Sequence, residues 1–237
     1  MISELFNTIL YQPLLNLLIL FYVYIPGGDF GIAVIALTLL IKIILLPVSL
    51  KATHSQRKLS LLQPKIKQIQ KKYEKDKAKQ SEELMNLYKN EKINPFSGCL
   101  PFIIQLPFLI ALYKVFLSGL NIERIRPLLY GFVPPISSIN PVFLGFINLN
   151  SPNAPLAFLA AVLQFLQTKS ISLKTTKKHS KESFFQKQTL YFFPLLTFFL
   201  VWKFGAVIGI YWITTTLFSL GEYYIIKSKE KTSLTAD

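Results

Sequence analysis

The feature that most constrains this chain is an apolar run from Phe30 to Leu50 that contains one charged residue, Lys42. A helix of this length spans about 30 Å, the thickness of the hydrocarbon core of a bilayer. Lys42 lies eight residues before Leu50, which places it about 12 Å inside that end of the helix. A lysine at this depth costs about 2.5–3.5 kcal/mol against lipid. We therefore expect Lys42 to face water or protein within the membrane.

Polar residues share the helical face of Lys42. Thr38 lies one turn before it and Ser49 two turns after it, so the three side chains form a stripe on an otherwise apolar helix. Such a stripe indicates a groove that holds water. The alternative is that the lysine stem carries the ammonium back to the interface, but the stem spans only about half of the required depth.

Apolar and basic residues are segregated along the chain. Half of the residues (51%) are hydrophobic, yet the formal net charge is +14, and the lysines gather between apolar runs. This pattern is typical of a polytopic membrane protein and explains the excess of basic residues without nucleic-acid binding. The single Cys99 gives no multi-cysteine metal site, and no nucleotide-binding loop or catalytic triad is present. We expect neither a metal, a cofactor nor an enzymatic activity.

The apolar runs predict an all-α membrane protein with five transmembrane helices. The first core span is residues 30–50, and residues 94–226 supply the other four with the loops 120–153 and 169–187. Gln105 should reach the same depth as Lys42 from the second span, and the two side chains are expected to line one cavity. The later spans are predicted at about residues 97–117, 155–173, 189–202 and 206–226.

Residues 1–29 are predicted to form a separate N-terminal helix. Its polar residues recur every four positions on one face, which favours a helix lying in the membrane interface, with a sixth span as the alternative. We expect Pro13 to bend this helix and the Pro26-Gly27-Gly28-Asp29 cluster to end it. The polar stripe consists of Glu4, Thr8, Gln12 and Asn16.

Residues 51–93 hold twelve lysines and arginines against five acidic residues and predict a basic helical hairpin. Apolar residues from Leu59 to Tyr73 follow a heptad spacing, and a second helical stretch runs from about Gln80 to Glu91. Pro64 either kinks the first helix or begins a new one. Most of the lysines are expected to form a solvated face, and the hairpin as a whole to offer a docking surface or to contact anionic lipid.

Basic residues are unevenly distributed between alternate loops. The hairpin region holds twelve, residues 169–187 six and the short tail 227–237 three, against two in residues 120–153. The positive-inside rule then places the hairpin, the 169–187 loop and the C-terminus in the cytoplasm, and the N-terminus and the 120–153 loop outside.

Four stretches of the chain resemble the YidC/Oxa/Alb family of membrane protein insertases. The resemblance covers about residues 11–226, and its most specific part is the segment 88–113 with Asn94-Pro95 and Gly98-Cys99. The four stretches are LLIKIILLPVS, LLQPKIKQIQKKY, LMNLYKNEKINPFSGCLPFIIQLPFLIALYKVF and YFFPLLTFFLVWKFGAVIGIYW.

The resemblance implies five core spans around a hydrophilic groove that opens to the cytoplasm and to lipid. In the family a basic residue, usually arginine, projects into this groove from the first core span. Lysine in that place keeps the charge but loses the planar fork of donors. The residues expected to act are Lys42 as the groove cation, Thr38, Gln105 and Thr215 as groove lining, and Phe102, Leu106, Phe198 and Trp202 as a face along which a client's apolar segment slides.

The implied function is insertion and folding of client membrane proteins in the bacterial cytoplasmic (inner) membrane. The implied partners are clients, nascent chains and membrane lipid, with the Sec translocon and the ribosome as further candidates and no nucleic acid bound directly. The chain resembles a short form without the large extracytoplasmic domain of Gram-negative members, and its tail is shorter than the basic extension of ribosome-docking members. Two alternatives remain open: a small transporter with Lys42 as its substrate or proton site, and an assembly chaperone that does not insert its clients.

Overall fold

The computed structural model describes residues 2–94, 100–118, 122–171 and 184–234, which are predominantly helical apart from the connection 129–153. The predicted all-α class is confirmed, and the only strands within these ranges are the short pair β1 (Val142–Phe143) and β2 (Ile147–Asn148). The longer helical elements are α2 (Gln12–Tyr24), α3 (Phe30–Leu61), α4 (Gln63–Lys72), α5 (Lys77–Asn90), α6 (Leu100–Ser118), α8 (Ala154–Ile171), α9 (Phe184–Phe204) and α10 (Ala206–Leu234). The shorter ones are α1 (Ile2–Phe6), the π-helical turn η1 (Asn7–Tyr11), α7 (Ile122–Ile125) and the 3-10 turn η3 (Arg126–Leu128).

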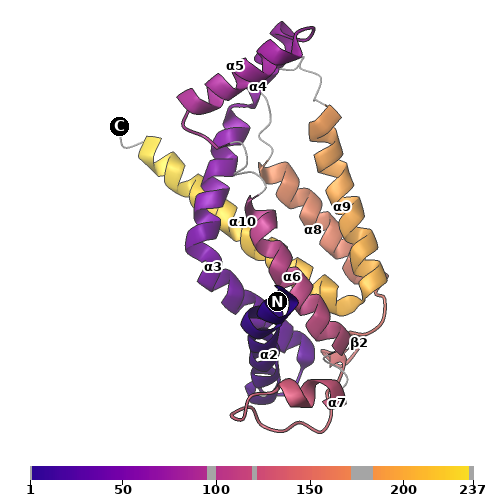
Figure 1. Cartoon of the computed structure of the whole chain (residues 1–237). Helices are drawn as coiled ribbons and strands as arrows, with labels where there is room; N and C mark the ends of the chain where they lie inside the picture. Colours follow the sequence, from indigo (N-terminus) through magenta and orange to yellow (C-terminus); the bar gives the residue numbers. More distant parts are fainter. Residues whose placement is uncertain (1, 95–99, 119–121, 172–183, 235–237) are drawn as a thin grey trace.

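The long helices form one bundle, and different elements lie at its two ends. α3 packs against α10 and α2, and α8 packs against α9 and α10. The α4–α5 hairpin projects from one end of the bundle, and α7 lies with the β-strands at the opposite end (Figure 1). The basic hairpin and the connection that contains α7 are therefore separated by the length of the apolar helices.

Three helices of the described chain are long and apolar enough to cross a membrane: Ser3–Tyr24, Phe30–Leu61 and Ala154–Ile171. Two shorter apolar stretches, Gln105–Phe116 and Leu190–Phe204, lie within α6 and α9. The apolar runs predicted from the sequence therefore correspond to helices, and the number that cross the membrane stays a prediction.

The first core helix continues beyond the predicted end of its span. α3 runs without a break from Phe30 to Leu61, because no glycine or proline follows Leu50 until Pro64. Pro64 lies in the first turn of α4, where its missing N–H is not needed. Of the two roles considered for Pro64, beginning a new helix is the one observed. The two hairpin helices then follow as α4 and α5, with α5 beginning at Lys77.

Asp29 fixes the start of the helix that carries Lys42. Its Oδ1 accepts hydrogen bonds from the backbone N–H groups of Gly31 and Ile32 at 2.8 and 3.1 Å. Its Oδ2 accepts from the N–H of Leu144 at 2.7 Å. One carboxylate thus caps α3 and ties it to the turn between β1 and β2.

The polar stripe on the N-terminal helix is partly explained by contacts inside the protein. The Asn16 amide donates to the carbonyls of Gln12 and Leu128 at 2.8 and 3.0 Å and accepts from the N–H of Tyr130 at 2.7 Å. Gln12 also donates to the Leu128 carbonyl at 3.1 Å. These two stripe residues therefore hold the η3 region instead of facing headgroups, whereas Thr8 is exposed.

A tight turn at Gly205 sets the start of α10. Gly205 has φ +96°, and a Cβ there would lie 3.1 Å from the Leu149 carbonyl oxygen. That carbonyl accepts from the N–H of Val207, and the Ser151 carbonyl accepts from the N–H of Ala206. The loop after β2 therefore caps the helix that carries one wall of the pocket described below.

We expect Gly205→Ala to lower the free energy of unfolding by about 1–2 kcal/mol, because the left-handed backbone is strained for residues with a Cβ. Gly221→Ala is the matched control, since Gly221 is helical and a Cβ there meets nothing within 4 Å. Thermal unfolding in detergent should show a lower Tm for Gly205→Ala only. Equal Tm values for the two variants would contradict the role of this turn.

Candidate functional site

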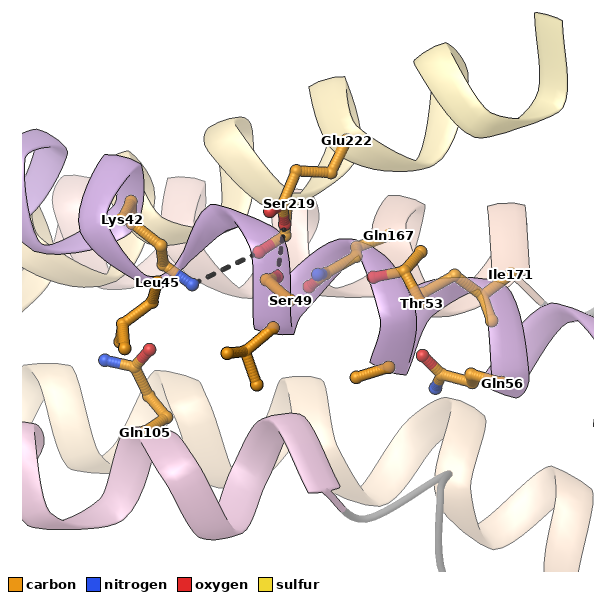
Figure 2. Close-up of a pocket in the computed structure, with 12 residues that line it drawn as sticks. Lys42, Leu45, Ser49, Thr53, Gln56, Gln105, Gln167, Ile171, Ser219 and Glu222 are labelled. Atoms are coloured by element: carbon orange, nitrogen blue, oxygen red, sulfur yellow. Dashed lines mark hydrogen bonds between the residues drawn. The ribbon is translucent and has the colours of Figure 1, made fainter. Parts of the chain in front are cut away.

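A partly open polar pocket lies between α3 and α10, with α6 and α8 supplying its other walls (Figure 2). Most of its lining side chains are polar although the helices around it are apolar. The lining residues are Lys42, Leu45, Val48, Ser49, Ala52, Thr53 and Gln56 from α3, Gln105 from α6, Gln167 and Ile171 from α8, and Ser219 and Glu222 from α10.

The spacing of residues on α3 explains why one helix supplies so much of the lining. Lys42, Leu45, Ser49, Ala52 and Gln56 follow one another at intervals of three or four residues, which places them on one face. Residues between them, such as Ile43 and Ile44, are exposed on the outside of the bundle. The helix therefore shows a polar face to the pocket and an apolar face to its surroundings.

Lys42 is buried in this pocket, with 9% of its surface exposed. Its Nζ donates a hydrogen bond to Ser219 Oγ at 3.4 Å, as the dashed line in Figure 2 shows. Lys42 and Glu222 attract each other across the pocket, but within the described chain no carboxylate lies within ion-pair distance of Lys42. The lysine is thus held in a polar environment without being neutralised by a direct contact.

Glu222 is a buried acidic residue of the same pocket, 3% exposed. Its Oε2 accepts a hydrogen bond from Ser49 Oγ at 2.9 Å. Its Oε1 is buried and has no hydrogen-bond partner among the described residues. Glu222 was not among the predicted site residues, although it is the only acidic residue in the predicted span 206–226. A lone charge in an apolar run is the same signal that singled out Lys42.

The structure brings together two of the four residues predicted as groove cation and lining. Gln105 lines the same pocket as Lys42, from the opposite wall (Figure 2). Thr38 is 1% exposed and donates to the Val34 carbonyl of its own helix at 2.6 Å, so it is not among the pocket residues. Thr215 lies one turn before Ser219, outside the pocket lining, and its buried Oγ1 has no partner among the described residues.

The predicted client-sliding residues lie on two helices. Leu106 on α6 and Trp202 on α9 are exposed, at 40% and 47%. Phe198 is half-buried and packs against Trp202 with the ring centroids 5.7 Å apart. The side chain of Phe102 lies outside the described residues.

These features define a class: a polytopic α-helical membrane protein with a polar pocket inside its apolar bundle. The family model described as "60Kd inner membrane protein" matches residues 21–233. The chain therefore belongs to this family.

Curated relatives in the family carry the name "Membrane protein insertase YidC". Those of Francisella tularensis subsp. novicida (strain U112), subsp. tularensis (strain SCHU S4 / Schu 4) and subsp. holarctica (strain LVS) are each 33% identical over 199 residues. The aligned region covers 84% of this chain and 32% of each relative. The chain thus spans about a third of the length of the relatives that it matches.

Proposed function

We propose that the protein is a membrane protein insertase and that the pocket around Lys42 is the inner part of a groove that receives the polar segment of a client. Family membership and the name of the relatives support this proposal. The observation that carries it is a buried lysine held in a partly open polar pocket inside an apolar bundle.

The proposed mechanism addresses one physical problem, which is moving a short polar segment across hydrocarbon while the adjacent apolar segment enters lipid. A wet groove that reaches part of the way through the membrane shortens the dry path. Lys42 then stabilises an acidic client segment more strongly than a lysine in bulk water does, because the local dielectric is lower. Gln105 supplies a further polar group from the facing wall, whereas Thr38 and Thr215 lie outside the pocket lining. No covalent step is needed.

The client's apolar segment leaves the groove sideways along exposed apolar side chains. Leu106 and Trp202 are exposed at the surface of the bundle, and Phe198 supports Trp202 from within. We include Phe102 in this face on the basis of its position in the sequence. The aromatic and aliphatic surfaces match those of lipid tails, so a hydrophobic segment can pass from one to the other at little cost.

We assign the protein to the bacterial cytoplasmic membrane with the N-terminus outside and the C-terminus inside. The excess of lysine in residues 51–93 supports this orientation, as does the position of the hairpin and α7 at opposite ends of the bundle (Figure 1). Clients and nascent chains then approach from the hairpin end. The ribosome and the Sec translocon are candidate partners on that side and in the membrane.

Reconstitution into vesicles tests the proposed function. A single-span client with a short acidic tail is added to vesicles with and without the protein, and translocation of the tail is measured by protection from external protease. We expect protection to depend on the protein. Client crosslinking without tail protection would instead favour an assembly chaperone, and flux of a small solute without client insertion would favour a transporter.

A further inference from the structure

We propose that Glu222 is a second, specificity-determining pole of the groove, which accepts a basic side chain from the polar segment of a client. This inference rests on the proposed insertase function and concerns which clients the groove takes. The inference goes beyond a groove with one fixed cation, because it gives the groove a negatively charged residue as well as a positively charged one.

The first observation is that one carboxylate oxygen of Glu222 accepts no hydrogen bond from the described residues. Glu222 is almost fully buried, and only its Oε2 has a partner, Ser49 Oγ at 2.9 Å. Oε1 has no donor among the described residues, and the side chain lines the pocket. A buried carboxylate oxygen without a donor is costly. A donor that enters the pocket and reaches Glu222 would therefore fill a hydrogen-bonding position that no described residue occupies.

The second observation is the arrangement of the two charges. Lys42 and Glu222 lie on facing helices, and each is oriented by a serine of the opposite helix: Lys42 by Ser219 on α10, and Glu222 by Ser49 on α3 (Figure 2). Among the described residues, the Lys42 ammonium and the Glu222 carboxylate form no ion pair with each other. The remaining pocket side chains are neutral.

The consequence concerns the chemistry of the client. The lining residues carry one positive and one negative charge, so a purely acidic tail is attracted by Lys42 and repelled by Glu222. A basic tail is attracted by Glu222 and repelled by Lys42. A tail that carries both acidic and basic residues can interact favourably with both. The groove of this protein is therefore expected to take clients with basic or mixed polar segments, and not only acidic ones.

The test compares three clients that differ only in their tails, which carry two aspartates, two lysines or two asparagines. Insertion is measured in vesicles at zero membrane potential, so that the field does not sort the tails by charge. We expect Glu222→Gln to raise the ratio of acidic-tail to basic-tail insertion about tenfold, as expected for loss of one charge-assisted contact. Glu123→Gln is the matched control, because Glu123 is exposed on α7, at the end of the bundle opposite the hairpin, and it should leave the ratio unchanged.

A second measurement uses the unsubstituted protein and does not depend on how the variant folds. A zero-length carbodiimide reagent joins a carboxylate to an amine in direct contact, and the lysine-tailed client is arrested during insertion by a folded domain at its other end. Mass spectrometry is expected to find an amide bond between the client lysine and Glu222. An unchanged ratio in folded Glu222→Gln, or no link to Glu222, would overturn the inference while insertion by the unsubstituted protein continues. Failure of that protein to insert any of the three clients would instead overturn the proposed function.

Discussion

Lys42→Glu is expected to reduce insertion of an acidic-tailed client by about tenfold or more, whereas Lys42→Arg retains it. The arginine variant keeps a positive charge at the pocket, but the glutamate variant creates a second carboxylate beside Glu222. Two unit charges 4 Å apart interact by about 4 kcal/mol at an effective dielectric of 20, and about 1.4 kcal/mol changes an equilibrium tenfold. The protease-protection assay in reconstituted vesicles measures the effect directly.

Two control variants separate charge from other causes. Lys203→Glu makes the same change of charge at an exposed residue at the end of α9, and we expect it to leave insertion nearly unchanged. Lys42→Met keeps an unbranched side chain of similar length without the charge, and its activity should fall between those of the arginine and glutamate variants. Equal insertion by Lys42→Arg and Lys42→Glu would show that the groove does not act through the charge at this position.

Asn16→Ala is expected to destabilise the protein by about 3 kcal/mol, the largest effect on stability that we predict. The buried Asn16 amide accepts from the Tyr130 N–H and donates to the Leu128 carbonyl. Removing it leaves the Tyr130 N–H without its partner and takes one of two donors from the Leu128 carbonyl. Each unsatisfied buried group costs about 1–3 kcal/mol. The Tm in detergent measures the loss.

Thr8→Ala is the matched control for this prediction. Thr8 belongs to the same polar stripe but is exposed, so its removal should change the Tm little. If the stripe served only to face an aqueous interface, the two alanine variants would behave alike. A similar Tm for Asn16→Ala and Thr8→Ala would therefore contradict the account of how this helix is held.

Local sequence signals were sufficient to predict that these helices exist and where two of the breaks between them fall. The Pro26–Asp29 cluster follows the end of α2, as predicted, and Asp29 also caps α3, which was not predicted. The break predicted between residues 202 and 206 is observed as the junction between α9 and α10. α3 continues as a helix past the predicted membrane span, because the change from apolar to basic residues after Leu50 marks a change of surroundings, not of backbone conformation. A helix ends where capping or proline requires it, and a polarity boundary imposes neither.

Contacts between distant segments could not be predicted from periodicity. Two of the three partners of Asn16, Leu128 and Tyr130, lie more than 110 residues away in the chain, so these contacts could not be predicted from the sequence. The rise per residue did predict that Gln105 and Lys42 lie at the same depth, because both positions could be counted from the predicted ends of their spans. Glu222 depends on how α10 is rotated against α3, and that rotation is set by packing.

Thr38 shares a helical face with Lys42 but does not line the pocket. It lies one turn from Lys42, but its hydroxyl donates to the Val34 carbonyl within α3, a common use of threonine in apolar helices. Residues on one face can therefore differ in surroundings, because the pocket extends along α3 from Lys42 towards Gln56 and not towards Thr38.

Position 42 is expected to be in contact with water that reaches it from the hairpin side of the membrane. Lys42→Cys in a Cys99→Ser background provides a single thiol, since Cys99 is the only cysteine in the chain. A membrane-impermeant thiol reagent is added to either side of sealed vesicles that hold the protein in one orientation. We expect labelling from the hairpin side only. Labelling from the opposite side only, or from neither side while the denatured protein reacts fully, would show that the pocket is not a groove open to that side.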